Sequence, residues 1–507
     1  MGMLRCLGAG LLCALLTTRP AAAQEGSAAD TSVMRSPVML DGSHWAVGAA
    51  RRAEAMGLAP GFLPARTEVA RDLVWAALQS ARGQAAARGG AIAELASGWV
   101  DRFAEEFPEY RAETAEGAGA PALLGSSVEG EYLLARGRAG PGEGEFAPDR
   151  TGAEPLPNRS GLAARAELAA GWGSRFAAHA RIRTGNDSTA VRQLVLSARA
   201  GAFTLTGGRD LVGYGTGLGG GVVLVGGMSM DGIQLESWRP VIGPGWLRYL
   251  GPMTFDAFAG HIPGDRHPGD PYVWGARGSF QPHPRMTFSI QRAALFGGAG
   301  SERPVNFSNI LHMLIGRVVG ASFEDQVVSM GGRFRLPTES ALPLMIYAEV
   351  GSEDAAGSFW QVPGMLAGIE SAALPGAPWL SLGVEGSVFA HSCCGNPPWY
   401  RHFAFPGSWA LDDRPLGHRL GGQGTELAAY GHADLLDARL RVGAEAFRRG
   451  RSGENLYLPG REGGSLGGGW DLAWRFDPRA ELGAEAHLED GRGWHEGTLR
   501  LSARWIF

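Results

Sequence analysis

The chain has 507 residues, of which 45% are hydrophobic and 19% are charged, so it is long enough to bury a large core. Its 79 glycines are roughly twice the usual share, and no apolar run of about eighteen residues follows the N-terminal segment, which excludes a helical membrane protein. The formal net charge of -5 and the lack of a long basic block exclude a nucleic-acid partner.

The first residues have the features of a secretory signal peptide. Arg5 precedes an apolar stretch over residues 7–16, and three consecutive alanines end at Ala23, directly before Gln24. We therefore expect residues 1–23 to be removed when the chain is exported.

Removal of this signal leaves few cysteines. Cys6 and Cys13 lie within it, so the mature chain keeps only the adjacent Cys393 and Cys394. Neighbouring cysteines cannot connect distant segments, and two interpretations stay open: a strained vicinal disulfide, or a reduced pair in a loop.

A helical period runs through residues 43–111. Apolar side chains recur at spacings of three and four on two predicted helices: Val69, Leu73, Ala77 and Ala81 on one, and Ile92, Leu95, Trp99, Phe103 and Phe107 on the other. Thr67 is placed to cap a helix that opens at Glu68, and Pro108 ends the last helix. With the segment 45–56, the pattern predicts a bundle of about three helices within a domain over residues 24–120.

From residue 121 to residue 507 the pattern changes to short alternating stretches separated by glycine, proline, asparagine and aspartate. In residues 175–183, Phe176, Ala178, Ala180 and Ile182 share one face, whereas Arg175, His179, Arg181 and Arg183 share the other. The stretches 193–200 and 328–336 alternate in the same way, with Arg333 and Arg335 on one face. A sheet with one apolar and one charged face is typical of a membrane barrel, whose backbone groups all pair internally.

The C-terminal residues form the most specific local pattern. Leu499, Leu501, Ala503, Trp505 and Phe507 share one face, Arg500, Ser502 and Arg504 share the other, and the chain stops at the aromatic residue. This pattern is typical of the last strand of an outer-membrane barrel. A soluble protein rarely ends in a bare aromatic edge strand, because such an edge promotes aggregation.

These patterns together predict the fold class. It is mainly β: a large antiparallel transmembrane β-barrel with a small N-terminal α-helical bundle. A spanning strand with its share of turn and loop takes roughly 20 residues, so residues 121–507 predict on the order of 16 to 18 strands. Side chains alone cannot fill so wide a barrel, so its lumen is either open or plugged.

Two clusters combine aromatic rings with planar polar groups, which is what sugar binding requires. The first contains Trp246, Arg248 and Tyr249, and the second contains Trp399, Tyr400, Arg401 and His402. For both, the alternative is that the aromatic residues belong to the interface girdles of the barrel. For the second cluster, which follows two prolines in a long loop, we favour a binding role.

Three further polar residues, Arg209, Asp210 and Arg292, have two interpretations: they line the lumen and contact a ligand, or they belong to a solvated ion-pair network that stabilises the wall, which is the interpretation we favour.

The sequence indicates no catalytic or metal site. Residues 261–270 contain two histidines and two aspartates, but their spacing fits no defined metal site, and turn formation explains the proline, glycine and aspartate. The glycines of residues 215–221 lack the ending of a phosphate loop, and no nucleophile elbow is present. We therefore predict no cofactor and no enzymatic activity.

Four stretches of the barrel resemble the capsule-assembly Wzi family of outer-membrane proteins. They are residues 207–215, residues 243–252, residues 291–298 followed by Arg303-Pro304, and residues 398–402 leading to residues 415–418. The resemblance implies an 18-stranded barrel with the helical bundle at its periplasmic mouth, outer loops that fold in and close the pore, and a lectin role in holding capsular polysaccharide.

The resulting functional prediction is a non-catalytic, monomeric outer-membrane lectin-like barrel. Its expected partners are capsular or exopolysaccharide, through the residues named above, and the lipid and lipopolysaccharide of the outer membrane. The alternatives are a channel that transports or exports polysaccharide or small solutes, and an outer-membrane hydrolase.

Overall fold

The computed structural model describes most of the chain. It covers residues 19–20, 35–111, 121–137, 145–146, 156–157, 160–185, 189–215, 217–262, 266–315, 319, 322–338, 341–353, 363–389, 398–407, 409–411 and 414–507. No helix in these ranges is long and apolar enough to cross a membrane. Cys393 and Cys394 lie outside the described residues.

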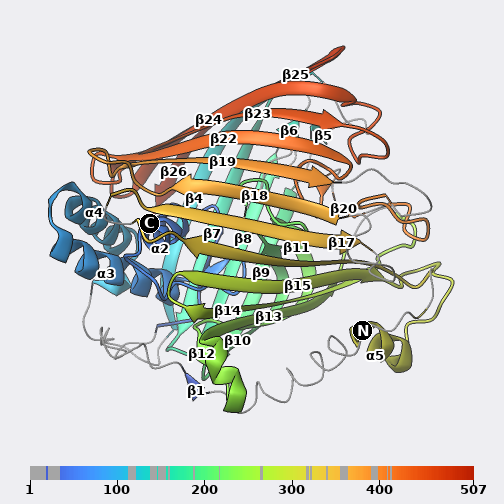
Figure 1. The fold of residues 1–507 in the computed structure, drawn as a ribbon, viewed down its shortest axis with the longest axis horizontal. Coiled ribbons are helices and arrows are strands. Elements are labelled where there is room, and N and C mark those ends of the chain that lie inside the picture. The colour runs from blue at the N-terminus through green and yellow to red at the C-terminus, as the bar shows by residue number, and fades with distance from the viewer. Residues whose placement is uncertain are drawn as a thin grey trace.

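Within the described residues, 18 antiparallel strands form one closed sheet (Figure 1). Each strand pairs with the next long strand along the chain, and the last strand pairs with the first through partners such as Leu501 and Tyr132. The strands are β4 (Pro121–Arg136), β7 (Ser160–Trp172), β8 (Phe176–Gly185), β9 (Thr189–Ala200), β10 (Phe203–Tyr214), β11 (Leu224–Ser237), β13 (Pro252–His261), β14 (Tyr272–His283), β15 (Met286–Phe296), β16 (Glu324–Arg335), β17 (Leu344–Glu353), β18 (Pro363–Ser371), β19 (Leu380–Phe389), β22 (Gly424–Leu435), β23 (Leu440–Arg451), β24 (Gly463–Asp477), β25 (Ala480–Gly491) and β26 (Trp494–Ile506). The prediction of a large antiparallel barrel is confirmed.

Side chains alternate between the outer surface and the lumen, as the sequence predicts. On β8, Phe176 and Ile182 are exposed on the outer surface, whereas Arg181 points inward and pairs with Asp41 at 2.7 Å. The outer surface also carries exposed leucines around the barrel, including Leu162, Leu196, Leu427, Leu466 and Leu488. A charged lumen inside an apolar belt is the arrangement of a barrel that contacts lipid.

The two ends of the barrel differ (Figure 1). One end, here the bundle end, carries the N-terminal helices, the C-terminus and short turns such as residues 173–175 and 478–479. The opposite end, here the loop end, carries long connections such as residues 297–323 and 390–423.

Short elements lie within these connections. At the bundle end are β12 (Val241–Ile242) and the 3-10 helix η2 (Gly245–Leu250); at the loop end are β5 (Glu145–Phe146), β6 (Leu156–Pro157), α5 (Phe307–Leu314), β20 (Ala410–Leu411) and β21 (Arg414–Pro415). Within the segment expected to be a signal peptide, β1 (Arg19–Pro20) pairs with β12. Removal of that segment stays a prediction.

The helical part consists of α2 (Trp45–Ala55), α3 (Arg71–Arg88), α4 (Gly90–Glu106) and the 3-10 helix η1 (Pro108–Tyr110), with the paired strands β2 (Met39–Leu40) and β3 (Val69–Ala70). The residues predicted for the apolar faces are buried or partly buried in its core. The predicted cap was wrong: α3 begins at Arg71, and the Thr67 hydroxyl donates to Gly213 O of β10 at 3.0 Å. The sequence pattern of a cap is present, but the hydroxyl lies between Gly213 O of the wall and Glu68 Oε2 instead.

The segment before α3 extends into the lumen. Arg66 is 1% exposed; its Nε donates to Glu236 Oε2 at 2.9 Å and its Nη1 donates to Asp210 Oδ2 at 3.1 Å. Because both carboxylates project from barrel strands, this arginine ties the N-terminal segment to the wall.

Helices α2 and α4 dock on the turns of the bundle end. Arg52 donates to Asp434 at 2.8 Å, Arg102 donates to Glu481 at 2.9 Å, and Glu106 accepts from Arg475 at 2.9 Å and from Trp45 Nε1 at 2.7 Å. These ion pairs are buried or partly buried, so the bundle covers this mouth of the barrel as a fixed part of the structure.

Glu106 is the most heavily contacted carboxylate in this interface. Besides Arg475, it lies 3.3 Å from His44 Nε2 and 3.7 Å from Arg504 Nη1. Burial by itself raises the pKa of Glu106, but its interactions with His44, Arg504 and Arg475 outweigh burial and hold that pKa well below its usual value.

We expect Glu106→Gln to loosen the bundle, because Arg475 would be left as a buried charge without its partner. Breaking a buried ion pair from one side costs about 3 to 5 kcal/mol. The measurement is the rate of tryptic cleavage within α3 in the detergent-solubilised protein. Glu105→Gln is the matched control: its partner Arg439 is largely exposed, and an exposed pair contributes about 0 to 1 kcal/mol. Equal cleavage rates for the two variants would contradict the assignment.

The ionisation of Glu106 determines how docking of the bundle on the barrel should depend on pH. Because the pKa of Glu106 is lower in the folded state, its contribution is complete above about pH 4.5 and is lost as the pH falls toward the folded-state pKa. We expect amide hydrogen exchange in α4, corrected for intrinsic rates, to accelerate in acid in the wild type. In Glu106→Gln the exchange should already be fast at pH 7 and should lack this acid-dependent step.

Candidate functional site

At the loop end, described residues of three connections fold into the lumen. We call the described residues of 215–223, 398–423 and 452–462 the plug. Trp399, Tyr400 and Trp409 are fully buried and pack against inward-facing wall residues such as Tyr347 and Phe389. The described wall and plug residues therefore form one apolar cluster across the barrel interior.

Tyr400 lies at the centre of the plug. Its hydroxyl donates to Val222 O at 2.6 Å and accepts from His418 N at 2.9 Å. Burial raises the pKa of Tyr400 well above its usual value, so the hydroxyl keeps its proton and remains a donor. Trp409 Nε1 donates to Val223 O at 3.0 Å, so two residues of one loop hold two successive carbonyls of another.

Carboxylates of the wall hold the backbone of the plug. Glu353 accepts from Tyr400 N at 2.7 and 2.8 Å, and Glu349 accepts from Val222 N at 2.9 Å. Glu385 accepts from Leu218 N at 2.7 Å and Gly219 N at 3.2 Å. Inside a barrel these loop N–H groups need acceptors, and ionised acceptors form roughly twice as strong a hydrogen bond as neutral ones.

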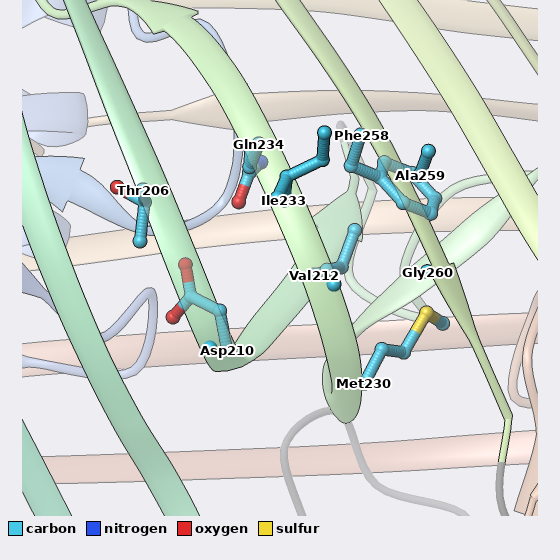
Figure 2. Close-up of a pocket in the computed structure, with 11 residues that line it drawn as sticks. Thr206, Asp210, Val212, Met230, Ile233, Gln234, Phe258, Ala259 and Gly260 are labelled. Carbon is cyan, nitrogen blue, oxygen red and sulfur yellow. The ribbon is translucent and has the colours of Figure 1, made fainter.

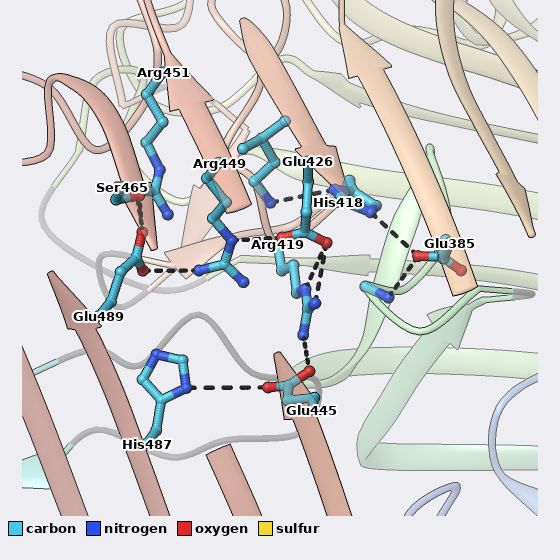
Figure 3. Close-up of polar contacts among 12 residues, drawn as sticks. Glu385, His418, Arg419, Glu426, Glu445, Arg449, Arg451, Ser465, His487 and Glu489 are labelled. Atoms are coloured by element: carbon cyan, nitrogen blue, oxygen red, sulfur yellow. Dashed lines mark hydrogen bonds and ion pairs between the residues drawn. The ribbon is translucent and has the colours of Figure 1, made fainter. Parts of the chain in front are cut away.

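An Arg–Glu network continues from the plug into strands β22 to β25 (Figure 3). Arg419 of the plug donates to Glu426 at 3.0 and 3.1 Å and to Glu445 at 2.9 Å. Arg449 bridges Glu426 to Glu489, which also accepts from Arg451 at 2.8 Å and from Ser465 at 2.6 Å. All of these side chains are buried or nearly so, and opposite charges alternate through the network.

Two parts of this network have the donor types of a metal site: Glu385 with His418 and Glu426, and His487 with Glu489 and Glu496. Both oxygens of Glu426 and both oxygens of Glu489 already accept from arginines. Cations supplied by the chain itself therefore pair with one carboxylate in each cluster, Glu426 and Glu489. Of the histidine-containing segment 261–270, residues 263–265 lie outside the described residues.

The structure separates the two predicted aromatic clusters. Trp246, Arg248 and Tyr249 lie in η2 at the bundle end, where they are exposed, and Arg248 Nη2 donates to the Tyr249 hydroxyl at 2.9 Å. Trp399 and Tyr400 lie in the plug at the loop end. One ligand at one mouth cannot contact both clusters.

Within the second cluster, the described structure buries the two largest rings and exposes a neighbour. Trp399 and Tyr400 are fully buried and His402 is 8% exposed, whereas Phe403 is 72% exposed and its ring contacts the His402 ring in a tilted arrangement with centroids 4.6 Å apart. Arg401 Nη2 donates to Asn455 O at 3.1 Å, which places this arginine between two plug loops. Sequence reasoning missed Phe403, although it directly follows the predicted cluster.

Arg209 and Arg292 do not line the lumen, whereas the Arg209–Asp231 pair agrees with the ion-pair interpretation. Arg209 alternates with the inward-facing Asp210, so it lies on the outer surface, where it pairs with Asp231 at 2.6 Å. Arg292 follows the exposed Ile290 on the outer face of β15. A two-residue period assigns residues to two faces, and neighbouring contacts decide which face is which.

Asp210 does face the lumen, where it borders a small hollow in the wall (Figure 2). The hollow exists because Gly208, Gly232 and Gly260 are cross-strand partners on β10, β11 and β13. A Cβ at Gly232 would lie only 2.3 Å from Ala259 O. The Asp210 carboxylate already accepts from Gln193 at 2.6 Å as well as from Arg66, so its role here is to hold the wall.

Comparison with known proteins identifies a matching family and similar folds. The sequence matches the model of the capsule assembly protein Wzi family over residues 154–493. The fold is similar to that of Wzi from Escherichia coli, an outer-membrane carbohydrate-binding β-barrel involved in group 1 capsule assembly, with a TM-score of 0.66, 14% identity, and coverage of 92% of this chain and 99% of that one. Similarity to OpdQ of Pseudomonas aeruginosa is lower, with a TM-score of 0.46, 12% identity and coverage of 76% and 98%. No curated protein matches the sequence.

We expect the double variant Glu353→Ala, Glu385→Ala to open the barrel. It removes the acceptors of the Tyr400, Gly219 and Leu218 N–H groups, of which the first two are buried and the third is partly buried. Each buried group left unpaired costs about 1 to 3 kcal/mol. The measurement is conductance in planar bilayers, where the wild type should stay closed and the variant should show frequent openings. Glu485→Ala is the control, because this half-exposed carboxylate lies on strand β25 and pairs with Arg500 of the wall. A variant that stays closed while its circular dichroism matches wild type would contradict the role given to these carboxylates.

Proposed function

The chain belongs to the capsule assembly protein Wzi family, and from this premise we propose that it binds capsular polysaccharide or exopolysaccharide at the bacterial cell surface without chemically altering it. The family match covers two thirds of the chain. The similar Escherichia coli protein is itself a carbohydrate-binding barrel. Both findings favour a binding role over catalysis.

In this proposal the barrel spans the outer membrane with the loop end outward and the bundle in the periplasm. The apolar outer belt would contact lipid and lipopolysaccharide, and the short turns and aromatic C-terminus would lie on the inner side, as in outer-membrane barrels in general. A closed sheet leaves no edge for pairing with another chain, which is compatible with a monomer.

The observation that carries the proposal is the plug. It joins the apolar cluster of the lumen, and wall carboxylates hold its backbone. A lumen filled by the plug in this way favours a fixed binding surface over a channel. A surface held by many internal contacts also loses little conformational entropy when a polymer binds.

We place the sugar-binding surface on the outer side of the plug. Phe403 offers an exposed ring for stacking on a pyranose, the partly exposed Arg401 lies nearby with a guanidinium for hydroxyls or carboxylates, and the buried His402 supports the Phe403 ring. Arg266 of the β13–β14 connection donates to Ala410 O, which brings a second guanidinium to the same loops. Trp399 and Tyr400 would act from beneath, by holding this surface in place.

Trp246, Arg248 and Tyr249 fit a different role in this orientation. Exposed aromatic residues at the bundle end also include Trp172, Phe176, Trp474, Trp505 and Phe507. Exposed aromatic rings near one end of a membrane barrel are typical of an interface girdle, which is the alternative that the sequence leaves open.

Alanine substitution distinguishes the two ends. We expect Phe403→Ala to weaken retention of the purified protein on its native polysaccharide about tenfold, because an aromatic stacking contact contributes about 0.5 to 1.5 kcal/mol beyond its burial. Trp246→Ala is the matched control and should bind as wild type does. Loss of binding in Trp246→Ala but not in Phe403→Ala would move the site to the bundle end, and no retention of the wild type would overturn the proposed function.

A further inference from the structure

One arginine lies on the part of the outer wall that should face lipid. Arg292 is two residues beyond Ile290, whose side chain is 46% exposed on the same face of β15. A charged side chain at the lipid surface of a barrel is unfavourable unless something covers it. The structure shows what covers this one.

Helix α5 folds back over the outer wall at this point. Its Met313 is buried in a cluster with Ala294, Phe296 and Phe323, and Ile310 packs against the same cluster. Met313 O accepts from Arg292 Nη2 at 3.0 Å, and Gln326 Oε1 accepts from Arg292 Nε at 2.9 Å. The Arg292 guanidinium also lies 5.3 Å from the centre of the Trp274 ring. The arginine is therefore satisfied between the wall and the helix.

The side of α5 that faces away from this cluster carries an apolar row that no described residue covers, flanked by the exposed Ser308 and the partly exposed His312. Phe307 is 81% exposed, and Leu311 and Leu314, which follow at helical spacing, are 44% and 43% exposed. One uncovered apolar side chain is ordinary on a water-exposed helix, but an aligned row of three is not.

Several backbone groups at the two ends of the helix are paired within the protein. Asn306 Oδ1 accepts from Asn309 N at 2.9 Å, Asn309 Nδ2 donates to Pro304 O at 3.0 Å, and Ile315 N donates to Leu311 O at 3.1 Å. Arg292 occupies a carbonyl of the last turn. Such internal pairing is what a hydrocarbon environment requires, since no water is present to hydrogen-bond the ends.

We propose that α5 is a membrane-embedded part of the barrel wall, and that its Phe307–Leu311–Leu314 face binds the acyl chains of lipids in the leaflet at the loop end. The helix continues the apolar belt beyond Ile290 and replaces the charged surface of Arg292 with an apolar one. It thus gives one side of the barrel a lipid contact that the strands alone lack. This inference concerns the outer wall and does not depend on which polymer the plug binds.

Spin labelling in reconstituted lipid vesicles tests the proposal. In the mature protein, which lacks Cys6 and Cys13, with Cys393→Ser and Cys394→Ser, a nitroxide is attached at Leu311→Cys. Leu427→Cys on the outer face of β22 is the lipid-facing reference, and Glu302→Cys, exposed just before α5, is the water-facing reference. Accessibility to oxygen, which partitions into lipid, is compared with accessibility to a water-soluble nickel chelate.

We expect the oxygen-to-nickel accessibility ratio at Leu311 to match that at Leu427 and to exceed that at Glu302 several-fold. A ratio like that at Glu302 would mean that α5 lies in water and would overturn the proposal. Low accessibility to both reagents would mean that protein covers this face and would overturn it as well. A water-like ratio at Leu427 would overturn both this inference and the membrane location under the proposed function, whereas failure at Leu311 alone leaves polysaccharide binding untouched.

Discussion

The requirement that every backbone group in a bilayer be paired internally underlies the rest of this structure. An antiparallel sheet meets it only by closing, here through β26 and β4. Closure of 18 strands creates a lumen wider than wall side chains can fill, so the lumen stays open unless further chain enters it. The N-terminal segment that carries Arg66 enters from one end and the plug that carries Trp399 and Tyr400 enters from the other. Bundle, plug and buried charge network are all consequences of filling one large cylinder.

Charged side chains occupy much of the lumen, and the way they pair explains why the interior is ordered. A carboxylate in a low-dielectric lumen needs a donor, and each inserted loop brings backbone N–H groups that need an acceptor. Glu349, Glu353 and Glu385 meet both needs at once. Arg419 of the plug and Arg449 of the wall alternate with Glu426 and Glu489 in the lumen, so that like charges are kept apart. The result at the loop end is a surface with its aromatic and guanidinium groups held by contacts beneath them, which suits recognition of a polymer.

On the outer surface, apolar side chains dominate, and the few charged groups must also be paired within the protein. Leucines and aromatic rings dominate the wall, and the charged exceptions are compensated locally: Arg209 by Asp231 on the neighbouring strand, and Arg292 by Gln326 and the end of α5. Polar groups on a lipid-facing wall are tolerable only when their partners come from the protein itself. The position of α5 is therefore tied to the presence of Arg292.

The sequence by itself determined the two-residue period, the aromatic last strand and the helical N-terminal part, and with them the barrel, because these are local patterns set by the geometry of a strand or a helix. It did not determine which aromatic residues of the 399–403 stretch are buried, that Thr67 binds Gly213 instead of capping a helix, or that Arg209 and Arg292 face outward. Those outcomes depend on contacts such as Tyr400 with Val222, between residues 178 positions apart. Only the closed tertiary structure decides which distant group lies within reach of each side chain.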